Sequence, residues 1–339
     1  MSSKYSIHTD SSFIRSSGWK EYVLEHADGN FFQLPEAYDL FNYVPGYTPF
    51  VFAVINAEGK IAGILVSVLQ QENKFYAAFT SRSIIWGGPL VDHPEACELL
   101  LMQYQETLRD KAIYTQFRNT FDTSFLKSSF QKSGFNYLEH LNFLVHTHSE
   151  SPEKLLSTMS KSKSRQIKKG LQSAEIIEST DENEVNDFYQ LLQNLYHEKV
   201  NKPLAPKEFF NFFRDQLLPK GLGKFLLIRH EGKIIGGIVC PIFPGKAIYE
   251  WYIAGMDKEY KEQYPSILST WAAIAEGQKM NLKHFDFLGA GKPDADYGVR
   301  DFKAKFGGEL VQFGRYEKIH KPFLMKIGVL GLKILKFIK

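Results

Sequence analysis

The feature that most constrains the fold is an internal repeat with a period of about 170 residues. The segment 54–64 reads as strand, turn and strand, and the segment 228–238 has the same pattern, with Glu-Gly-Lys-Ile-x-Gly in both. A match confined to a turn would be weak evidence, because Gly and charged residues are common in hairpins. The order of the flanking segments therefore decides whether the chain is duplicated.

The flanking segments repeat in the same order. The first half contains, in chain order, a strand at 83–86, a helix at 94–112, a strand at 113–117 and a final strand at 134–138. The second half contains a strand at 249–254, a helix at 265–280, a strand at 284–287 and a final strand at 307–311. Each helix begins with a proline, which the first helical turn tolerates because its N–H needs no partner there.

We therefore predict an α/β (α+β) fold made of two tandem domains, each a mixed sheet covered by helices. The predicted boundaries are 1–150 for the first domain and 151–318 for the second, followed by a basic amphipathic helix at 319–339.

Composition indicates a folded protein in a reducing compartment. Hydrophobic residues make up 44% of the chain and charged residues 23%, as is usual for globular proteins. Cys97 and Cys240 lie in apolar surroundings without metal-ligand spacing, which predicts buried free thiols. The first residues lack the apolar core of a signal peptide, and His146 and His148 lack further ligands nearby. We expect a cytoplasmic protein, peripheral to the inner face of the membrane if its tail binds lipid, and no metal site.

The positive charge is concentrated in the tail. Net charge is +3, and residues 318–339 carry six lysines and no acidic residue. From Pro322 onward, lysines and large apolar residues fall on opposite sides at helical spacing. Two interpretations remain open: an interfacial helix on anionic lipid, or a terminal helix that packs against the first domain.

Two segments contain a high density of polar side chains. The segment 285–308 lies at and after the late apolar strand of the second half, and ligands of open α/β sheets bind beyond the carboxyl ends of strands. Residues 161–169 carry five cations, which is the pattern expected for binding phosphates but also for a solvated helix start.

Motifs in both halves resemble those of the Fem family of aminoacyl-tRNA-dependent peptidyltransferases. In the second half they are Tyr252–Gly255, Phe285–Gly289, Gly298-Val299, Phe302-Lys303 and Phe306–Gly308. Upstream they are Asn30–Gln33, Gly87–Asp92 and Arg165–Gly170. Gly87 stands where cell-wall members carry an arginine, which points to a Fem-related subgroup.

The resemblance implies two GNAT-like domains and a reaction in which an acceptor amine attacks an amino acid ester delivered on tRNA. Lys303 then takes the place of the lysine that stabilises the oxyanion, with a solvated loop lysine as the alternative. Asp92 is the second catalytic candidate, as proton acceptor or orienting group, and a helix cap is the alternative. The expected substrate-binding residues are Tyr252, Asp286, Phe302, Arg165, Lys168 and Arg118. For Tyr252 simple packing is the alternative, and for Asp286 a structural partner.

The function predicted from these features is transfer of an amino acid from aminoacyl-tRNA to an amine of a peptidoglycan or cell-surface precursor, linked to a lipid or a nucleotide. No cofactor is expected, since aminoacyl-tRNA is a co-substrate. One rival is an N-acyltransferase of the GNAT type that uses acetyl-CoA on a surface saccharide. It requires a glycine-rich turn at a helix start, which the segment 263–266 does not provide. The other rival is a non-catalytic binding module for cell-envelope biosynthesis.

Overall fold

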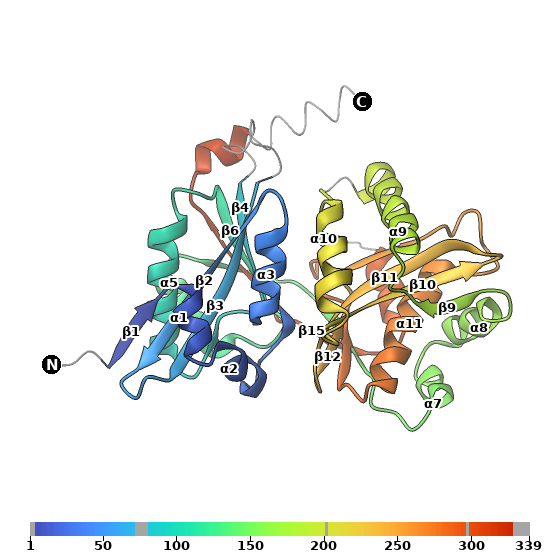
Figure 1. Ribbon diagram of the computed structural model, residues 1–339, viewed down its shortest axis with the longest axis horizontal. Coiled ribbons are helices and arrows are strands. Elements are labelled where there is room, and N and C mark those ends of the chain that lie inside the picture. Colours follow the sequence, from blue (N-terminus) through green and yellow to red (C-terminus); the bar gives the residue numbers. More distant parts are fainter. Residues whose placement is uncertain (1–3, 72–80, 201–202, 296–297, 328–339) are drawn as a thin grey trace. The chain divides into compact units, whose positions relative to one another are not determined.

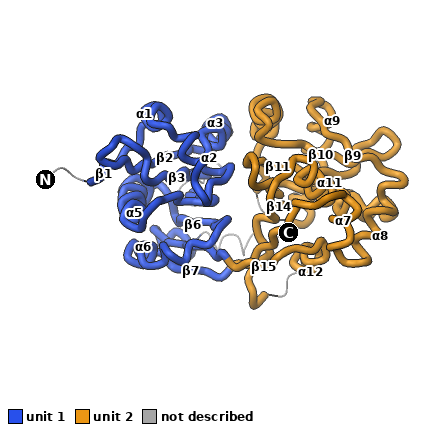
Figure 2. Tube along the Cα trace, turned by 90° about the horizontal axis from the view of Figure 1, so that it is seen from below, with its two compact units in different colours: residues 1–139, 313–339 blue, residues 140–312 orange. Residues whose placement is uncertain are grey.

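The chain folds into two compact units. The computed structural model describes residues 4–71, 81–200, 203–295 and 298–327. One unit comprises 1–139 together with 313–339, and the other comprises 140–312 (Figure 2). This division differs from the boundaries predicted at 150 and 318, because one strand of each sheet comes from the other half of the chain.

Each unit is built on one mixed sheet, and the two sheets have the same strand order. In the first the order is β1-β2-β3-β4-β6-β16-β7, with β5 beside β3; in the second it is β9-β10-β11-β12-β14-β8-β15, with β13 beside β11. The first sheet consists of β1 (Tyr5–His8), β2 (Tyr47–Asn56), β3 (Ile61–Gln70), β4 (Arg82–Trp86), β5 (Leu90–Val91), β6 (Tyr114–Arg118), β7 (Asn136–Leu138) and β16 (Arg315–Ile319). The second consists of β8 (Asn142–His146), β9 (Glu175–Glu178), β10 (Gly223–His230), β11 (Lys233–Phe243), β12 (Ala247–Tyr249), β13 (Tyr252–Gly255), β14 (His284–Asp286) and β15 (Glu309–Val311). The predicted duplication and the mixed α/β architecture are confirmed.

The two halves exchange one strand. β8 follows β7 in the chain but pairs with β14 and β15 in the second unit. β16 follows β15 but pairs with β6 and β7 in the first unit. Neither strand was predicted from the sequence, since each has its partners in a distant part of the chain.

Helices cover both faces of each sheet. Those of the first unit are α1 (Ser11–Ser16), α2 (Trp19–Glu25), α3 (Pro35–Tyr43), α5 (Pro94–Leu108) and α6 (Lys127–Lys132). Those of the second are α7 (Pro152–Ser157), α8 (Lys161–Gly170), α9 (Glu182–Leu195), α10 (Lys207–Phe212), α11 (Pro265–Lys279) and α12 (Gly298–Ala304), with π-helical turns at Tyr196–Val200 and Phe213–Leu217. α5 and α11 begin at the predicted prolines. In Figure 1, α5 and α3 lie on opposite sides of the first sheet.

Two glycines of β11 show how closely the second sheet is covered. A Cβ on Gly236 would lie 2.9 Å from Pro265 of α11, and one on Gly237 would lie 2.9 Å from Phe188 of α9. Successive strand residues point to opposite faces, so α11 and α9 cover different faces. The matching glycine of the first sheet, Gly63, faces Leu100 of α5 at 3.2 Å. Gly63 and Gly236, which hold the same position after the repeated turn, therefore allow the long helix of their unit to pack closely on the sheet.

The beginning of the basic tail is bound to the first unit. Lys318 Nζ donates to the carbonyl of Ser133 at 2.8 Å, and the backbone N–H of His320 donates to Ile113 at 2.8 Å. Residues 322–327 are helical, and the rest of the predicted amphipathic helix, 328–339, lies outside the described residues. None of the described helices combines the length and apolar composition that a bilayer crossing requires. Both cysteines are buried and unpaired, as predicted.

Candidate active site

Two neighbouring parallel strands inside the second sheet, β12 and β14, diverge at their carboxyl ends. β12 and β14 pair through Tyr249 and Asp286, and the backbone N–H of Glu250 still donates to the carbonyl of Asp286 at 2.9 Å. At Trp251 the chain turns to bond Val239 at 3.1 Å and continues beside β11 as β13. The separation lies beyond the carboxyl ends of the strands, where α/β folds place their ligands. Residues 249–254 were predicted to form one continuous strand, and the structure divides them between β12 and β13.

Lys303 fills the separation from α12. Its side chain is buried and its Nζ forms an ion pair with Glu250 at 2.8 Å. Nζ also donates to the carbonyls of Phe287 at 3.0 Å and Gly289 at 2.9 Å. These three partners use all the N–H groups of an ammonium. Lys303 is therefore not the solvated loop lysine of the alternative interpretation, and it can bind an oxyanion only by releasing one of these partners.

Asp286 completes the cluster as a buried carboxylate. Its Oδ1 accepts from Asn142 Nδ2 at 2.7 Å and from the backbone N–H of Leu288 at 2.6 Å, whereas its Oδ2 has no hydrogen-bond partner among the described residues. Burial raises the pKa of Asp286 from 3.8 to about 6, and the charge of Glu250 contributes in the same direction. The expected structural partner of Asp286 is thus Asn142, which the exchanged strand β8 supplies.

The loop after β14 is held in a fixed shape. Leu288 adopts a φ of 53°, a left-handed conformation that is costly for a branched residue. Arg300 of α12 donates to the carbonyls of Ala290 at 3.0 Å, Pro293 at 3.1 Å and Ala295 at 3.1 Å. Arg300 therefore fastens the loop whose carbonyls bind Lys303.

Phe302 lies against a second buried lysine. Lys163 Nζ is 3.9 Å from the centroid of the Phe302 ring and 5.0 Å from that of Phe306. Burial, together with the charge of Lys305, lowers the pKa of Lys163 from 10.5 to about 8. Phe302 is half-buried and stacks on this ammonium from α12, so its predicted contact with substrate stays a prediction.

The run of five cations is divided among three environments. Arg165 and Lys168 are exposed and, with Lys161, line a cavity of about 340 Å³ beside α7 and α8. Lys163 is buried, and Lys169 is paired with Glu262. Lys161, Arg165 and Lys168 can therefore contact a phosphate group at this cavity. The alternative, a solvated helix start, does not describe Lys163 and Lys169, which are buried and ion-paired respectively.

Tyr252 belongs to an aromatic cluster. Its ring centroid lies 5.4 Å from Phe209, 5.3 Å from Phe210 and 6.3 Å from Tyr196. The Tyr252 side chain therefore packs against other aromatic rings, which agrees with the alternative of simple packing. It is also half-exposed at the start of β13.

Asp92 and Arg118 belong to the first unit, whereas the other six predicted residues belong to the second. Asp92 is exposed and its Oδ1 accepts from the hydroxyl of Tyr22 at 3.1 Å. The residue before α5 is His93, which makes no side-chain cap, so the helix-cap alternative for Asp92 is wrong. Arg118 ends β6 and its guanidinium lies 5.3 Å from the ring of Trp86.

Two members of the cluster, Glu250 and Asn142, were not among the predicted residues. Glu250 is an acid within an otherwise apolar strand segment, and Asn142 stands between the apolar residues Leu141 and Phe143. A polar side chain inside a buried strand requires a partner, so each position carried a usable signal. The pairing itself depends on the exchanged strand and was not visible in the sequence.

Comparisons with known proteins agree with this architecture. Residues 154–303 match the family model described as an acetyltransferase (GNAT) domain. No curated protein matches the chain. Among solved structures, FemX is similar at 14% identity and a TM-score of 0.69, covering 91% of this chain and 97% of FemX.

Two further solved structures have the same fold over nearly their whole length. The C-terminal domain of a putative lysylphosphatidylglycerol synthetase from Agrobacterium fabrum is 12% identical, with a TM-score of 0.57 and coverage of 95% and 97%. A tandem GNAT protein from the clavulanic acid biosynthesis pathway is 8% identical, with a TM-score of 0.57 and coverage of 93% and 98%. Residues 154–303 of the second unit thus match the GNAT acetyltransferase domain model. The whole chain has the Fem-like tandem GNAT fold.

Proposed function

We propose that the protein transfers an amino acid from aminoacyl-tRNA to an amine of a cell-envelope precursor. The observation that carries this proposal is the buried cluster of Lys303, Glu250 and Asp286 at the strand separation. A fixed ammonium at the carboxyl ends of parallel strands, shielded from water, is suited to stabilise an oxyanion. The fold that the chain shares with FemX and the lysylphosphatidylglycerol synthetase domain supports aminoacyl transfer within the acyltransferase class.

In this reaction the acceptor nitrogen forms a bond to the ester carbonyl carbon, the ester C–O bond breaks, and the proton lost by nitrogen passes to the leaving ribose oxygen. Lys303 releases one backbone carbonyl to bind the oxyanion, while Glu250 keeps the ammonium in place. Asp92 belongs to the first unit, and its role as proton acceptor or orienting group stays a prediction. Arg165, Lys168 and Lys161 are proposed to bind the phosphates of tRNA or of the acceptor.

Acetyl-CoA is the second candidate donor, favoured by the GNAT family match. CoA pyrophosphate commonly binds the start of the corresponding helix, where backbone N–H groups are free. In this chain a carboxylate already occupies the start of α11: Asp257 accepts from the backbone N–H of Ser266 at 3.1 Å and from its hydroxyl at 2.5 Å. This contact, together with the lack of glycine in that turn, favours aminoacyl-tRNA.

Radiolabel transfer tests the proposal. Label is followed from charged tRNA or from acetyl-CoA to an extract of lipid-linked cell-wall precursors. We expect transfer from charged tRNA alone. Label from acetyl-CoA alone would replace the proposal by the acyl-CoA enzyme, and no transfer from either donor would favour the binding module.

The basic tail is proposed to contact anionic lipid. Phe323 is 74% exposed and Ile327 40% exposed on the described turn, and residues 318–339 carry six lysines without an acid. Apolar residues beside lysines bind anionic bilayer surfaces. Flotation with anionic vesicles is expected for the wild type and lost for Phe323→Ser/Ile327→Ser. Equal flotation of both proteins would contradict lipid contact.

A further inference from the structure

The second unit contains a buried lysine, Lys163, that the proposed reaction does not use. Lys163 lies on α8 and is 5% exposed, compared with 8% for Lys303. Its ammonium has no hydrogen-bond or ion-pair partner among the described residues, and it contacts the rings of Phe302 and Phe306. A buried charge without a counter-charge destabilises a fold, so packing alone does not explain an ammonium at this position.

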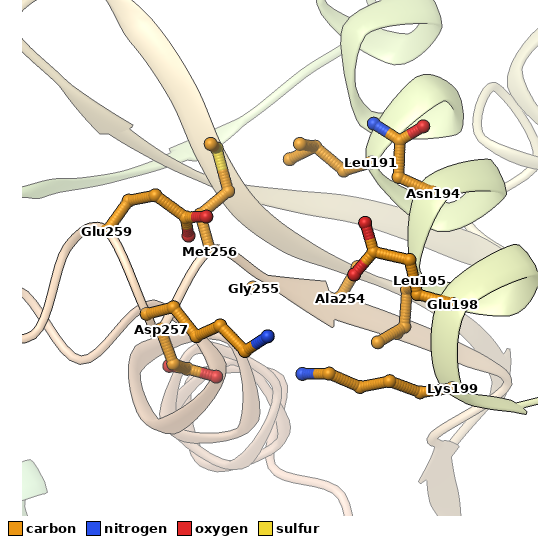
Figure 3. Close-up of a pocket in the computed structure, with 11 residues that line it drawn as sticks. Leu191, Asn194, Leu195, Glu198, Lys199, Ala254, Gly255, Met256, Asp257 and Glu259 are labelled. Atoms are coloured by element: carbon orange, nitrogen blue, oxygen red, sulfur yellow. The ribbon is translucent and has the colours of Figure 1, made fainter.

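The acidic residue whose charge acts on Lys163 is Asp257, and Asp257 is bound elsewhere. Figure 3 shows Asp257 on the loop before α11, at a cavity of about 130 Å³ whose other wall comes from α9 and its π-helical turn. Its carboxylate accepts from the backbone N–H of Ser266 at 3.1 Å and from the Ser266 hydroxyl at 2.5 Å. Lys163 therefore adds a positive charge to the interior of the second unit instead of forming half of an ion pair.

A cluster of three phenylalanines connects Lys163 with Lys303. Lys163 Nζ is 3.9 Å from the ring centroid of Phe302 and 5.0 Å from that of Phe306. The ring of Phe306 lies 6.0 Å from the ring of Phe287, and Lys303 Nζ is 4.9 Å from the Phe287 centroid. Phe287 and Phe306 are both buried. The two ammonium groups thus lie at the two ends of one chain of ring contacts.

The same cluster supplies part of the Lys303 site. The carbonyl of Phe287 is one of the three acceptors of the Lys303 ammonium, at 3.0 Å, so one residue gives Lys303 both a ring contact and a hydrogen bond. The backbone also joins α8 to the end of α12, because the N–H of Ser160 donates to the carbonyl of Lys305 at 3.0 Å. Lys163 is thereby fixed against the helix that carries Lys303.

We propose that Lys163 is a positioning residue of the transfer reaction, which holds the phenylalanine cluster against Lys303 and places a fixed positive charge behind the oxyanion site. A cation is attracted to the faces of aromatic rings, so the ammonium fixes ring orientations that a neutral side chain would not. A charge in a dry interior also acts more strongly than one in water, and it favours negative charge that develops beside Lys303. This inference rests on the proposed function, since it concerns the rate of that reaction.

The variant Lys163→Met separates this role from a structural one. Methionine keeps an apolar contact with the rings and removes the unpaired buried charge, so the variant should fold at least as stably as the wild type at pH 7. Label transfer from charged tRNA at pH 7 should show a kcat about five- to tenfold lower. The KM for charged tRNA should stay within about twofold of the wild type, because Lys163 does not line the cavity beside α7 and α8. A folded variant with the wild-type kcat would overturn the proposal.

The pH dependence of the rate distinguishes the charge of Lys163 from its shape. Burial, together with the charge of Lys305, lowers the pKa of Lys163 to about 8, whereas the charge of Asp257 acts in the opposite direction. The ammonium is therefore present at pH 7 and lost above about pH 8, so the ratio of the wild-type rate to the Lys163→Met rate should fall towards one by about pH 9. Titration of the acceptor amine is common to both proteins and cancels in this ratio.

The variant Lys305→Ala supplies the matched control. It removes one of the two causes that lower the pKa of Lys163, so it should move the fall of the rate to higher pH and leave the rate at pH 7 near that of the wild type. A ratio of wild-type to Lys163→Met rates that stays constant from about pH 6.5 to about pH 9.5 would assign the effect to packing and overturn the proposal.

A measurement without tRNA separates this inference from the proposed function. In protein labelled with carbon-13 at lysine Cε, the Lys163 resonance, identified by its loss in Lys163→Met, should titrate near pH 8. The Lys303 resonance, identified by its loss in Lys303→Met/Glu250→Gln, should show the same inflection in the wild type and lose it in Lys163→Met. A Lys303 resonance without this inflection would overturn the proposal. The inflection without any transfer by the wild type would instead refute the proposed function and leave the coupling of the two lysines standing.

Discussion

The two units have the same strand separation, and they fill it in different ways. In the first unit β4 leaves β6 at Gly87, whose N–H donates to the carbonyl of Arg118 at 3.0 Å, as Glu250 does to Asp286 in the second. The neutral side chain of Gln33 fills the first separation, donating to Trp86 at 2.8 Å and accepting from the N–H of Val66 at 2.7 Å. A lysine and two carboxylates occupy the second.

The difference indicates how a duplicated fold divides its tasks. In the first unit a Cβ on Gly88 would lie 2.8 Å from Gln33, and one on Gly87 would lie 2.6 Å from Asn30. These amides close the separation with neutral hydrogen bonds. The second separation holds charges, and one oxygen of Asp286 there lacks a hydrogen-bond partner within the described part of the chain. We therefore propose structural closure for the first separation and chemistry for the second.

The largest effect on stability is expected at Lys303. Lys303→Met leaves Glu250 buried without a counter-charge, which should lower the free energy of unfolding by about 3 to 5 kcal/mol. Lys303→Met/Glu250→Gln removes both charges and should recover most of this loss. Urea denaturation of the two variants measures the difference. If they are equally unstable, the ion pair does not hold the separation together.

Asp286 should make the free energy of unfolding depend on pH in the acidic range. Because its pKa is raised from 3.8 to about 6, the folded state binds more protons than the unfolded state between these values. Stability therefore falls as pH rises through this range, by about 3 kcal/mol for a two-unit shift. Asp286→Asn should lose this dependence. A variant with the wild-type profile from pH 4 to pH 7 would show that another group titrates.

The variant Gln33→Ala tests whether the Gln33 side chain stabilises the first strand separation. Gln33→Ala leaves the N–H and carbonyl of Val66 and the carbonyl of Trp86 without their partner, which should cost about 2 to 3 kcal/mol. Thermal unfolding measures the loss. Transfer activity per folded molecule should remain, since the role proposed for this separation is structural. Folded Gln33→Ala protein without activity would contradict the division of tasks.

Substitution of Lys163 should change the free energy of unfolding the least. Its pKa is lowered from 10.5 to about 8, so the unfolded state binds more protons between these values and stability rises with pH across them. Lys163→Met should remove this rise and stabilise the protein at pH 7 by about 1 kcal/mol, a value reduced for residual solvent screening. Denaturation at pH 7 and pH 10 checks both statements.

The sequence predicted the elements whose signals are local. Pro94 and Pro265 begin the two long helices, and Gly63 and Gly236 mark the repeated hairpin, because turn and cap chemistry acts over a few residues. The exchange of β8 and β16 was missed, since strand order is decided by pairing between distant segments. The same reason hid Asn142 as the partner of Asp286, although both Asp286, on an apolar strand, and Lys303, in the segment that follows it, had been named as candidate site residues.

The transfer rate of the double variant Lys303→Met/Glu250→Gln tests most directly whether the second strand separation carries the chemistry. Initial rates of label transfer from charged tRNA are compared for the wild type, Lys303→Met/Glu250→Gln and Lys305→Ala, an exposed lysine two residues away. We predict that the folded double variant loses about 100- to 1000-fold in rate while Lys305→Ala stays near the wild type. A folded double variant with wild-type transfer would contradict the assignment of chemistry to the second strand separation.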